Sequence, residues 1–414
     1  MQSMTYYRSA SKHLLVSSSA ARMKSSRVIN PRLKAFLSTA YKPVDFNNGS
    51  AVGVDGSIDD LKIEKKGAVE LSLALASSSC PAAVLARDTS VPIGHLRVTT
   101  ASGNMFRHIE ATPVTAMLGA EISGVDLSSP ALSEDVVEEI WGAFLLYGVL
   151  FFRDQKISPQ EQVGLAKRFG EIDRHPIVKG MAEEPDVIQI VREAGAPTNF
   201  GETWHSDNSY MLQPSLGSIL HAIEVPPVGN DTMFSCAYGT YESLSPALQN
   251  LLEGMRAVHT AGEAFNPASV VGGSFDNPEA AIKYTKAAEL ESQSIHPIFR
   301  THPETGRKAL FVNSMFTTHI EGMTRAESRP LLEYLFSQVG LPHLTCRYRW
   351  KAGDVAMWDN RCLQHVAIGD NSSHRRIMRR VTLKGDRPFL KVDNNNGKNS
   401  GGILADARMD EFTM

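Results

Sequence analysis

The C-terminal half of the chain is a succession of short strand-like segments, and this feature constrains the fold most strongly. Five apolar-rich runs lie between residues 308 and 383, with turn-forming residues between them: KALFVNSMF, LTCRYRW, DVAMWDN, CLQHVAI and RRIMRRVTL. Two earlier runs, SLGSILHAIEV and GNDTMFSCA, flank a Pro/Gly turn. Many short strands separated by turn signals are typical of closed or two-layered β architectures. We therefore predict a mostly β domain with flanking helices and a double-stranded β-helix (jelly-roll) core.

Helical patterns precede and interrupt the strand-like runs. The segment ALSEDVVEEIWGAFLLYG has apolar residues at helical spacing over residues 137–144 and ends at Gly148. The segment SPQEQVGLAKRFG begins with a capping box, in which Ser158 and Glu161 satisfy each other's backbone amides and Pro159 takes the first helical position. A further helix is expected in LSPALQNLLEGM. These patterns predict helices on the outside of the barrel.

The N-terminus differs in composition from the rest of the chain. Residues 1–44 contain no acidic residue, and their basic residues lie among serines and short apolar groups without a continuous apolar stretch. This composition is typical of an organellar transit peptide. The sequence therefore predicts a mitochondrial or plastid protein. The alternative is a disordered basic tail on a cytoplasmic protein.

The remaining boundaries follow from low-complexity segments. Residues 45–104 are low in aromatic content and show no sustained periodicity, so we expect a linker or a poorly ordered extension. The compact domain is predicted over 105–390, and the Asn/Gly-rich segment 391–414 is expected to be a flexible tail. Within the domain, a loop of Gly, Asn, Pro and Ser over 262–277 is expected to form a mobile lid.

Composition points to a small-molecule partner. The formal net charge of -3 gives no electrostatic reason to expect nucleic acid, and no apolar run approaches the roughly 18 residues that a membrane span needs. The four cysteines contain no C-x-x-C pair, so a zinc knuckle or a disulfide framework is not indicated.

The segment TWHSDNSY carries the first candidate metal ligands. In an extended segment residues two apart project to the same side, so His205 and Asp207 can converge on one ion. An imidazole and a carboxylate suit Fe(II) better than metals that prefer thiolates. The H-x-D pair is weak evidence alone because it recurs by chance. A third ligand has to come from another strand, and His365 in MWDNRCLQHVAIGD is the candidate, because a strand pattern there is followed by a turn.

Two histidines and one carboxylate leave positions on iron for a bidentate organic acid and O2. The commonest such acid is 2-oxoglutarate, whose distal carboxylate needs a cation, and arginine matches a carboxylate with two hydrogen bonds. In HRRIMRRVTLKGDRP, Arg376 and Arg380 are four residues apart and share one face of a strand, whereas Arg375 and Arg379 share the other. Any one of these arginines could equally belong to a solvated basic face.

Several of these segments together resemble the taurine and 2,4-dichlorophenoxyacetate dioxygenase family of iron- and 2-oxoglutarate-dependent enzymes. The resemblance rests on WHSD, GNDTMF, VNSMFTTHI, MWDNRCLQH and HRRIMRRVTLKGDRP in this order, and it extends from TAMLGAEISGVDLSSP and GVLFFRDQKISPQEQ onward. It implies a jelly-roll fold, Fe(II) with 2-oxoglutarate and O2 as cosubstrates, and a possible homo-oligomer. It implies as iron ligands His205, Asp207 and His365.

The resemblance also assigns roles around the metal. Thr232 matches a threonine that assists the cosubstrate, and Arg376 matches the arginine that binds its distal carboxylate. Arg380 matches an arginine that holds the anionic head of the primary substrate. His175 matches a substrate-binding histidine, and Phe316 matches an aromatic residue of the substrate pocket.

The sequence departs from the taurine enzyme at two positions. Val178 and Gly201 stand where that enzyme places a tyrosine and an asparagine near its substrate. The resemblance therefore implies a less polar substrate region, and a larger or more apolar carboxylate or sulfonate is expected in place of taurine.

The implied activity is oxidation of a C–H bond of a small anionic substrate, with release of succinate and CO2. Three alternatives stay open. The same iron chemistry could serve an oxidative cyclase or desaturase of a natural-product pathway, similar to kainoid synthases. A carnitine-pathway hydroxylase would need an aromatic cage for a quaternary ammonium, and the N-terminal zinc module of such enzymes is not visible. The third is a non-catalytic protein that binds 2-oxoglutarate.

Overall fold

The structure is a computed structural model, and it describes residues 106–129, 132–175, 178–196, 201–262 and 293–392. Several predicted segments lie outside the described residues. They are the transit peptide, the linker, the expected lid except Gly262, and the expected tail from residue 393 onward.

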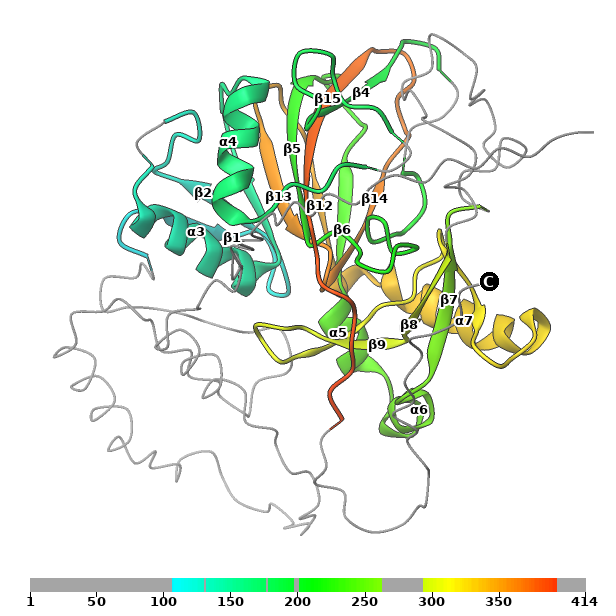
Figure 1. Ribbon diagram of the computed structural model, residues 1–414. Helices are drawn as coiled ribbons and strands as arrows, with labels where there is room; N and C mark the ends of the chain where they lie inside the picture. Colours follow the sequence, from blue (N-terminus) through cyan, green and yellow to red (C-terminus); the bar gives the residue numbers. More distant parts are fainter. Residues whose placement is uncertain (1–105, 130–131, 176–177, 197–200, 263–292, 393–414) are drawn as a thin grey trace, which may run out of the picture.

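A seven-stranded sheet forms the larger layer of the domain (Figure 1). Its neighbouring strands are antiparallel except β2 and β3, which run parallel. In spatial order the strands are β1 (Glu110–Pro113), β2 (Ala120–Ser123), β3 (Val149–Phe152), β13 (Val355–Asp359), β5 (Gly217–Glu224), β15 (Arg376–Leu383) and β4 (Ile188–Arg192).

A three-stranded sheet forms the second layer, with the order β12 (Thr345–Tyr348), β6 (Thr232–Cys236) and β14 (Leu363–Ala367). Aromatic contacts join the two sheets across a shared apolar core. Phe151 of β3 stacks on Tyr348 of β12 with ring centroids 3.8 Å apart, and Phe234 of β6 packs on Trp358 of β13 at 5.7 Å. The two sheets are the layers of the predicted jelly roll.

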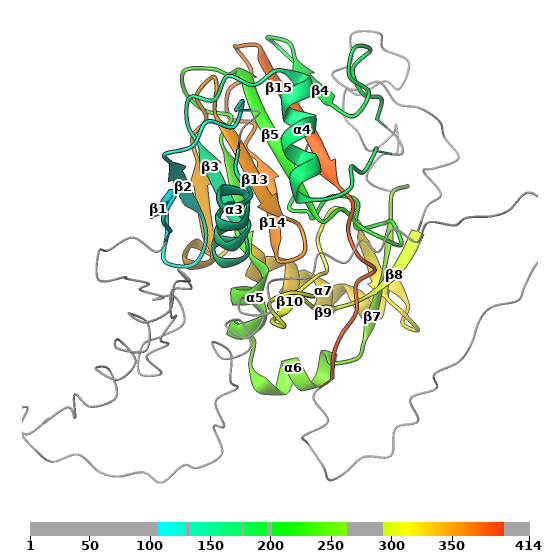
Figure 2. The ribbon, with the colours of Figure 1, turned by 60° about the vertical axis from the view of Figure 1, so that its left-hand side comes forward.

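Helices α3 (Glu134–Tyr147) and α4 (Pro159–Phe169) cover the outer face of the larger sheet (Figure 2). The predicted capping box of α4 is present, because Ser158 N donates to Glu161 Oε2 at 2.7 Å and Glu161 N donates to Ser158 Oγ at 3.2 Å. The continuous apolar run of β3 follows from this layering. Its residues alternate between the core under the helices and the core between the sheets, so both faces are buried.

The remaining elements complete the domain, and a third apolar core lies between several of them. They are helices α5 (Ala237–Ser243), α6 (Pro246–Leu252) and α7 (Arg325–Val339), the short 3-10 helix η3 (Pro342–Leu344), the sheet of β11 (Thr317–Ile320), β7 (Arg256–Thr260) and β8 (Gln293–Pro297), and the hairpin of β9 (Phe299–Thr301) with β10 (Lys308–Leu310).

One expected strand is shorter than predicted. KALFVNSMF was expected to be extended throughout, but β10 ends at Leu310. The chain then turns around Asn313, whose side-chain oxygen accepts from Phe316 N at 3.0 Å, and Thr317 Oγ1 accepts from Asn313 N at 3.0 Å. Such side-chain bonds to the backbone replace the strand ladder locally.

Across the part of the chain that is described, none of the helices combines the length and the apolar character that crossing a bilayer requires.

Candidate metal centre

The two candidate histidine ligands are joined through their backbones. His205 N donates to His365 O at 3.1 Å, and His365 N donates to His205 O at 2.9 Å, so the residues form an isolated antiparallel bridge. His365 belongs to β14, and the bridge attaches the segment of His205 to the edge of the smaller sheet. The imidazole centroids are 4.2 Å apart as a result.

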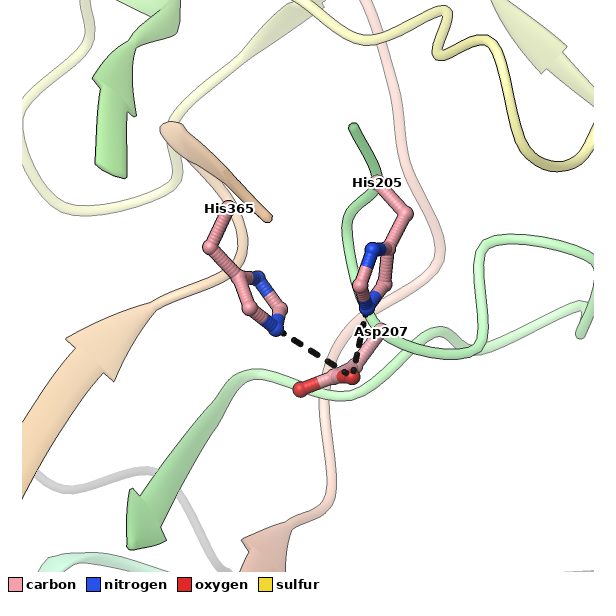
Figure 3. A group of neighbouring side chains, drawn as sticks. All are labelled: His205, Asp207 and His365. Atoms are coloured by element: carbon pink, nitrogen blue, oxygen red, sulfur yellow. Dashed lines mark ion pairs between the residues drawn. The ribbon is translucent and has the colours of Figure 1, made fainter. Parts of the chain in front are cut away.

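Asp207 completes a group of three buried side chains (Figure 3). Its Oδ1 lies 3.7 Å from His205 Nε2 and 3.9 Å from His365 Nε2, and one ligand atom from each residue lies within 4.8 Å of the others. The expected convergence of the H-x-D pair is confirmed. Asp207, however, lies in a turn and not in an extended strand.

Hydrogen bonds orient both His205 and the carboxylate. His205 Nδ1 is 2.7 Å from Thr203 O, so this nitrogen carries the proton and Nε2 presents its lone pair. Asp207 Oδ2 accepts from Ser218 Oγ at 2.8 Å and from Asn360 Nδ2 at 3.3 Å. These bonds to Oδ2 leave Oδ1 directed at the two imidazoles.

The protonation states suit a cation. Burial lowers the pKa of His205, and burial followed by repulsion from His205 lowers the pKa of His365 to about 3. Burial acts to raise the pKa of Asp207, but the Arg380 guanidinium and then the two imidazoles hold this pKa well below its ordinary value. At neutral pH the site therefore offers two neutral imidazoles and one carboxylate, and this donor set fits Fe(II).

A second buried cluster, His302, Asp359 and Cys362, also has one potential ligand atom per residue within 4.8 Å of the others. Its carboxylate is already neutralised, because Arg361 Nε and NH2 donate to Asp359 at 2.8 and 2.7 Å, and His302 Nε2 lies 3.0 Å from Asp359 Oδ2. A guanidinium in this position repels a metal ion, so the cluster is an internal ion-pair network.

Comparison with known proteins identifies the family. Residues 110–382 match the model of the taurine catabolism dioxygenase TauD, TfdA family. The chain belongs to the TauD/TfdA family.

Individual relatives agree with this assignment. An α-ketoglutarate-dependent sulfate ester dioxygenase of Pseudomonas putida is 34% identical over 282 residues, which cover 68% of this chain and 91% of that protein. An α-ketoglutarate-dependent 2,4-dichlorophenoxyacetate dioxygenase of Cupriavidus pinatubonensis is 32% identical over 295 residues, covering 67% and 98%. The crystal structure of a taurine dioxygenase from Burkholderia xenovorans superposes with a TM-score of 0.57 at 33% identity, covering 69% and 92%.

As a TauD/TfdA enzyme, the chain is an oxidoreductase that uses Fe(II), 2-oxoglutarate (α-ketoglutarate) and O2. His205, Asp207 and His365 would hold the iron. Iron and 2-oxoglutarate supply the oxidising chemistry when bound, and the protein binds, orients and shields the reacting groups.

The two arginines expected on one face of β15 are both buried there. Arg376 and Arg380 are 8% and 4% exposed, whereas Arg375 is exposed and pairs with Glu193. Within the described chain no carboxylate pairs with Arg376, and its Nε has no hydrogen-bond partner. Burial, followed by repulsion from Arg192, lowers the pKa of Arg376 to about 10. An unneutralised buried guanidinium fits an anionic ligand such as the distal carboxylate of 2-oxoglutarate.

Thr232, at the start of β6, accepts a hydrogen bond from Trp350 Nε1 at 2.9 Å. This leaves its hydroxyl hydrogen available for a further acceptor. Thr232 pairs with Ala367 in the ladder of β6 and β14, two residues beyond His365.

The expected substrate residues gather near the metal ligands to different degrees. Arg380 NH1 donates to Asp207 Oδ1 at 3.1 Å. Burial and then the charge of Arg380 lower the pKa of His175, whereas the charge of Asp207 raises it. Phe316 lies edge-on to His205 with centroids 6.2 Å apart. Val178 is buried and donates its backbone amide to His175 Nδ1 at 3.1 Å.

Gly201 has a structural role that the sequence did not reveal. Its φ is 83°, and a Cβ placed on it would lie 3.1 Å from His205 Cε1. The backbone carbonyl of Gly201 also accepts from Ala367 N at 2.8 Å. A glycine at this position therefore leaves room for the ligand imidazole.

Two residues that hold Asp207 were not among the predicted site residues. Ser218 lies on β5, and Asn360 follows β13, where its Oδ1 also accepts from Asp207 N at 3.3 Å and from Trp358 Nε1 at 3.0 Å. Asn360 lies within the MWDNRCLQH segment that carried His365, so that motif was the available signal. Nothing in the sequence around Ser218 marks it.

Proposed function

We propose that this enzyme oxidises a C–H bond of a small organic anion with an apolar body, such as a sulfate ester, a sulfonate or a carboxylate. In the proposed reaction one oxygen atom of O2 enters the substrate as hydroxyl, and the other enters succinate as 2-oxoglutarate loses CO2. The observation that carries the choice of substrate class is the position of the Arg380 guanidinium beside Asp207.

Arg380 shares an oxygen with the metal site. Its NH1 donates to Asp207 Oδ1, the same atom that lies closest to His205 Nε2 and His365 Nε2. With iron held by His205, Asp207 and His365, the guanidinium would lie beside a dication in a buried region. Two positive charges close together and away from water repel each other strongly, and this repulsion costs free energy. An anionic group on the substrate would offset that cost, and a neutral substrate would not.

His175 adds a neutral donor next to this cation. Its Nδ1 accepts from the Val178 amide, so its proton is on Nε2. Burial, followed by repulsion from Arg380, lowers the pKa of His175 to about 3, so the ring is neutral at physiological pH. A guanidinium and a neutral N–H donor together suit the oxygens of a sulfate, sulfonate or carboxylate group.

Two further observations support an apolar substrate body. Val178 and Phe316 are both buried apolar residues in this region. The two relatives described above act, by their names, on a sulfate ester and on 2,4-dichlorophenoxyacetate. Both substrates join an anionic head to a less polar group.

The test measures succinate released from 2-oxoglutarate in the presence of Fe(II), ascorbate and matched pairs of compounds. Each pair consists of an anion, which is an alkyl sulfate, an alkyl sulfonate or an aryloxyacetate, and the neutral alcohol or amide of the same carbon skeleton. We expect only the anion of each pair to stimulate succinate formation. Stimulation by the neutral partner to the same extent would refute the proposed substrate class.

Arg380→Met separates substrate binding from the rest of the reaction. We expect it to raise the KM of the stimulating anion at least about tenfold, because an interaction with a charged group is lost. The affinity for 2-oxoglutarate should change much less. Arg375→Met, which removes an exposed arginine directly before the same strand, is the matched control and should change neither constant.

Product mass distinguishes hydroxylation from the alternative outcomes. Hydroxylation adds one oxygen atom, whereas desaturation or ring closure removes two hydrogen atoms. Hydroxylation at the carbon bonded to a sulfate-ester oxygen would give a product that breaks down to an aldehyde and inorganic sulfate. The same assays therefore also test the oxidative cyclase alternative.

A further inference from the structure

Two buried arginines lie directly opposite each other at the edge of the larger sheet. Arg192 of β4 and Arg376 of β15 are partners in the antiparallel ladder. Directly opposed residues place their side chains on the same face of the sheet, with Cβ atoms about 4.5–5.5 Å apart. Their exposed fractions are 5% and 8%. A pair of guanidinium groups is thus held on one face of the sheet and away from water.

This arrangement is unfavourable unless an anion is present. Like charges directly opposite each other destabilise a sheet, and burial increases the cost. Repulsion from Arg192 contributes to lowering the pKa of Arg376. No described carboxylate forms an ion pair with either residue, although the exposed Glu202 attracts Arg192 through space.

The hydrogen bonds of Arg192 orient its guanidinium without neutralising it. NH2 donates to the backbone carbonyls of Asn371 and His374, the latter at 3.2 Å, and Nε has no partner within the described chain. Both carbonyls belong to the turn that leads from β14 into β15. They are uncharged, so the pair retains two positive charges.

We propose that Arg192 is a second guanidinium for the distal carboxylate of 2-oxoglutarate, acting beside Arg376. The inference rests on 2-oxoglutarate being the cosubstrate of the proposed reaction and on its distal carboxylate approaching Arg376. One carboxylate can accept hydrogen bonds from two guanidinium groups, because its two oxygens offer about four lone-pair sites. A carboxylate between Arg192 and Arg376 would remove the repulsion that the two arginines otherwise maintain.

A purely structural role for Arg192 is the competing explanation. In that case its bonds to the Asn371 and His374 carbonyls would only fix the turn before β15. Loss of Arg192 would then weaken the binding of any ligand that contacts β15, whether or not the ligand has a distal carboxylate. A pair of ligands that differ only in that carboxylate separates the two roles.

The experiment titrates 2-oxoglutarate and 2-oxopentanoate into the anaerobic Fe(II)-loaded protein by calorimetry. The two acids share the chelating 2-oxo acid group, but 2-oxopentanoate has a methyl group where 2-oxoglutarate has its distal carboxylate. We expect Arg192→Met to weaken the binding of 2-oxoglutarate about tenfold, because a hydrogen bond to a charged group is lost. The affinity for 2-oxopentanoate should change less than about twofold. Arg375→Met should leave both affinities unchanged.

Arg192→Gln provides a second variant that keeps N–H donors for the turn carbonyls but removes the charge. We expect it to lose most of the preference for 2-oxoglutarate over 2-oxopentanoate, and it decides between the two roles should the methionine variant fail to fold. Equal weakening of both acids, or no change in either, would overturn the inference. Failure of the unsubstituted protein to bind either acid would instead refute the proposed function.

Discussion

His205 and His365 each donate a backbone hydrogen bond to the other, at 3.1 and 2.9 Å. The separation of the two histidine backbones is therefore set by a β-bridge, and both imidazoles extend from this fixed base. Because His365 lies on β14, the ligand geometry depends on the ladder of the smaller sheet. The jelly roll thus fixes two of the three ligands before a metal binds, and Asp207 is positioned by separate contacts.

Loss of the Ser218 hydroxyl should weaken iron binding without unfolding the protein. Ser218→Ala removes the 2.8 Å hydrogen bond to Asp207 Oδ2 and leaves only the longer bond from Asn360 Nδ2, at 3.3 Å, to hold this oxygen. Residues that orient a metal ligand are typically worth 10- to 100-fold in affinity, so we expect the Fe(II) dissociation constant to rise by about tenfold. Anaerobic competition with a chelator of known affinity measures it.

Ser235→Ala is the control for this prediction. Ser235 is also buried in a strand, but its hydroxyl donates to Val339 O and contacts none of the metal ligands. Its removal should leave iron affinity unchanged. Equal effects of the two substitutions would show that the Ser218 contribution is not specific to Asp207.

A methyl group at residue 201 should displace the His205 ring. Gly201→Ala puts a Cβ 3.1 Å from His205 Cε1 at a backbone φ of 83°. Gly195→Ala introduces the same backbone strain at a φ of 85°, but its Cβ meets nothing within 4 Å. We expect both variants to lose a similar amount of stability, of order 1 kcal/mol. Only Gly201→Ala should also lose iron affinity, and an equal loss in Gly195→Ala would contradict this prediction.

Buried neutral histidines should make the metal-free protein sensitive to acid. Burial lowers the pKa of His296 to about 4, from an ordinary value of 6.5. Between these values the unfolded chain binds a proton that the folded chain does not, so the free energy of unfolding falls as pH falls from 6.5 toward 4. One such histidine contributes up to about 1.4 kcal/mol per pH unit. Urea titrations in a chelator across this range measure the slope.

His296→Gln should reduce that slope. The exposed His343 serves as the control, because His343→Gln leaves the buried histidines untouched. A slope that His296→Gln does not alter would show that this histidine does not contribute to the acid sensitivity.

The fold could be predicted largely because its signals are local. The α4 capping box joins Ser158 and Glu161, three residues apart, and the apolar run of β3 already indicates burial on both faces. The early end of β10 was missed, because Asn313 turns the chain through its side chain and interrupts a pattern that otherwise continues.

The site could be predicted only where residue chemistry identifies it. An H-x-D pair, a distant histidine and paired arginines were recognisable as ligands and cations. Ser218 could not be recognised, because nothing in the sequence distinguishes a serine that donates to Asp207 from any other buried serine. Arg192 was not, because its position opposite Arg376 depends on the register of β4 and β15, which the sequence leaves open.

The most direct test of the metal centre is anaerobic binding of Fe(II) and 2-oxoglutarate to the wild-type chain and to Asp207→Ala. We predict that wild type binds one Fe(II) per chain and then one 2-oxoglutarate. Asp207→Ala should weaken the binding of Fe(II) at least about a hundredfold and abolish the iron-dependent part of 2-oxoglutarate binding. Asp126→Ala, which removes an exposed carboxylate, should behave as wild type. Binding of both ligands to Asp207→Ala with wild-type affinity would contradict the assignment of the metal centre.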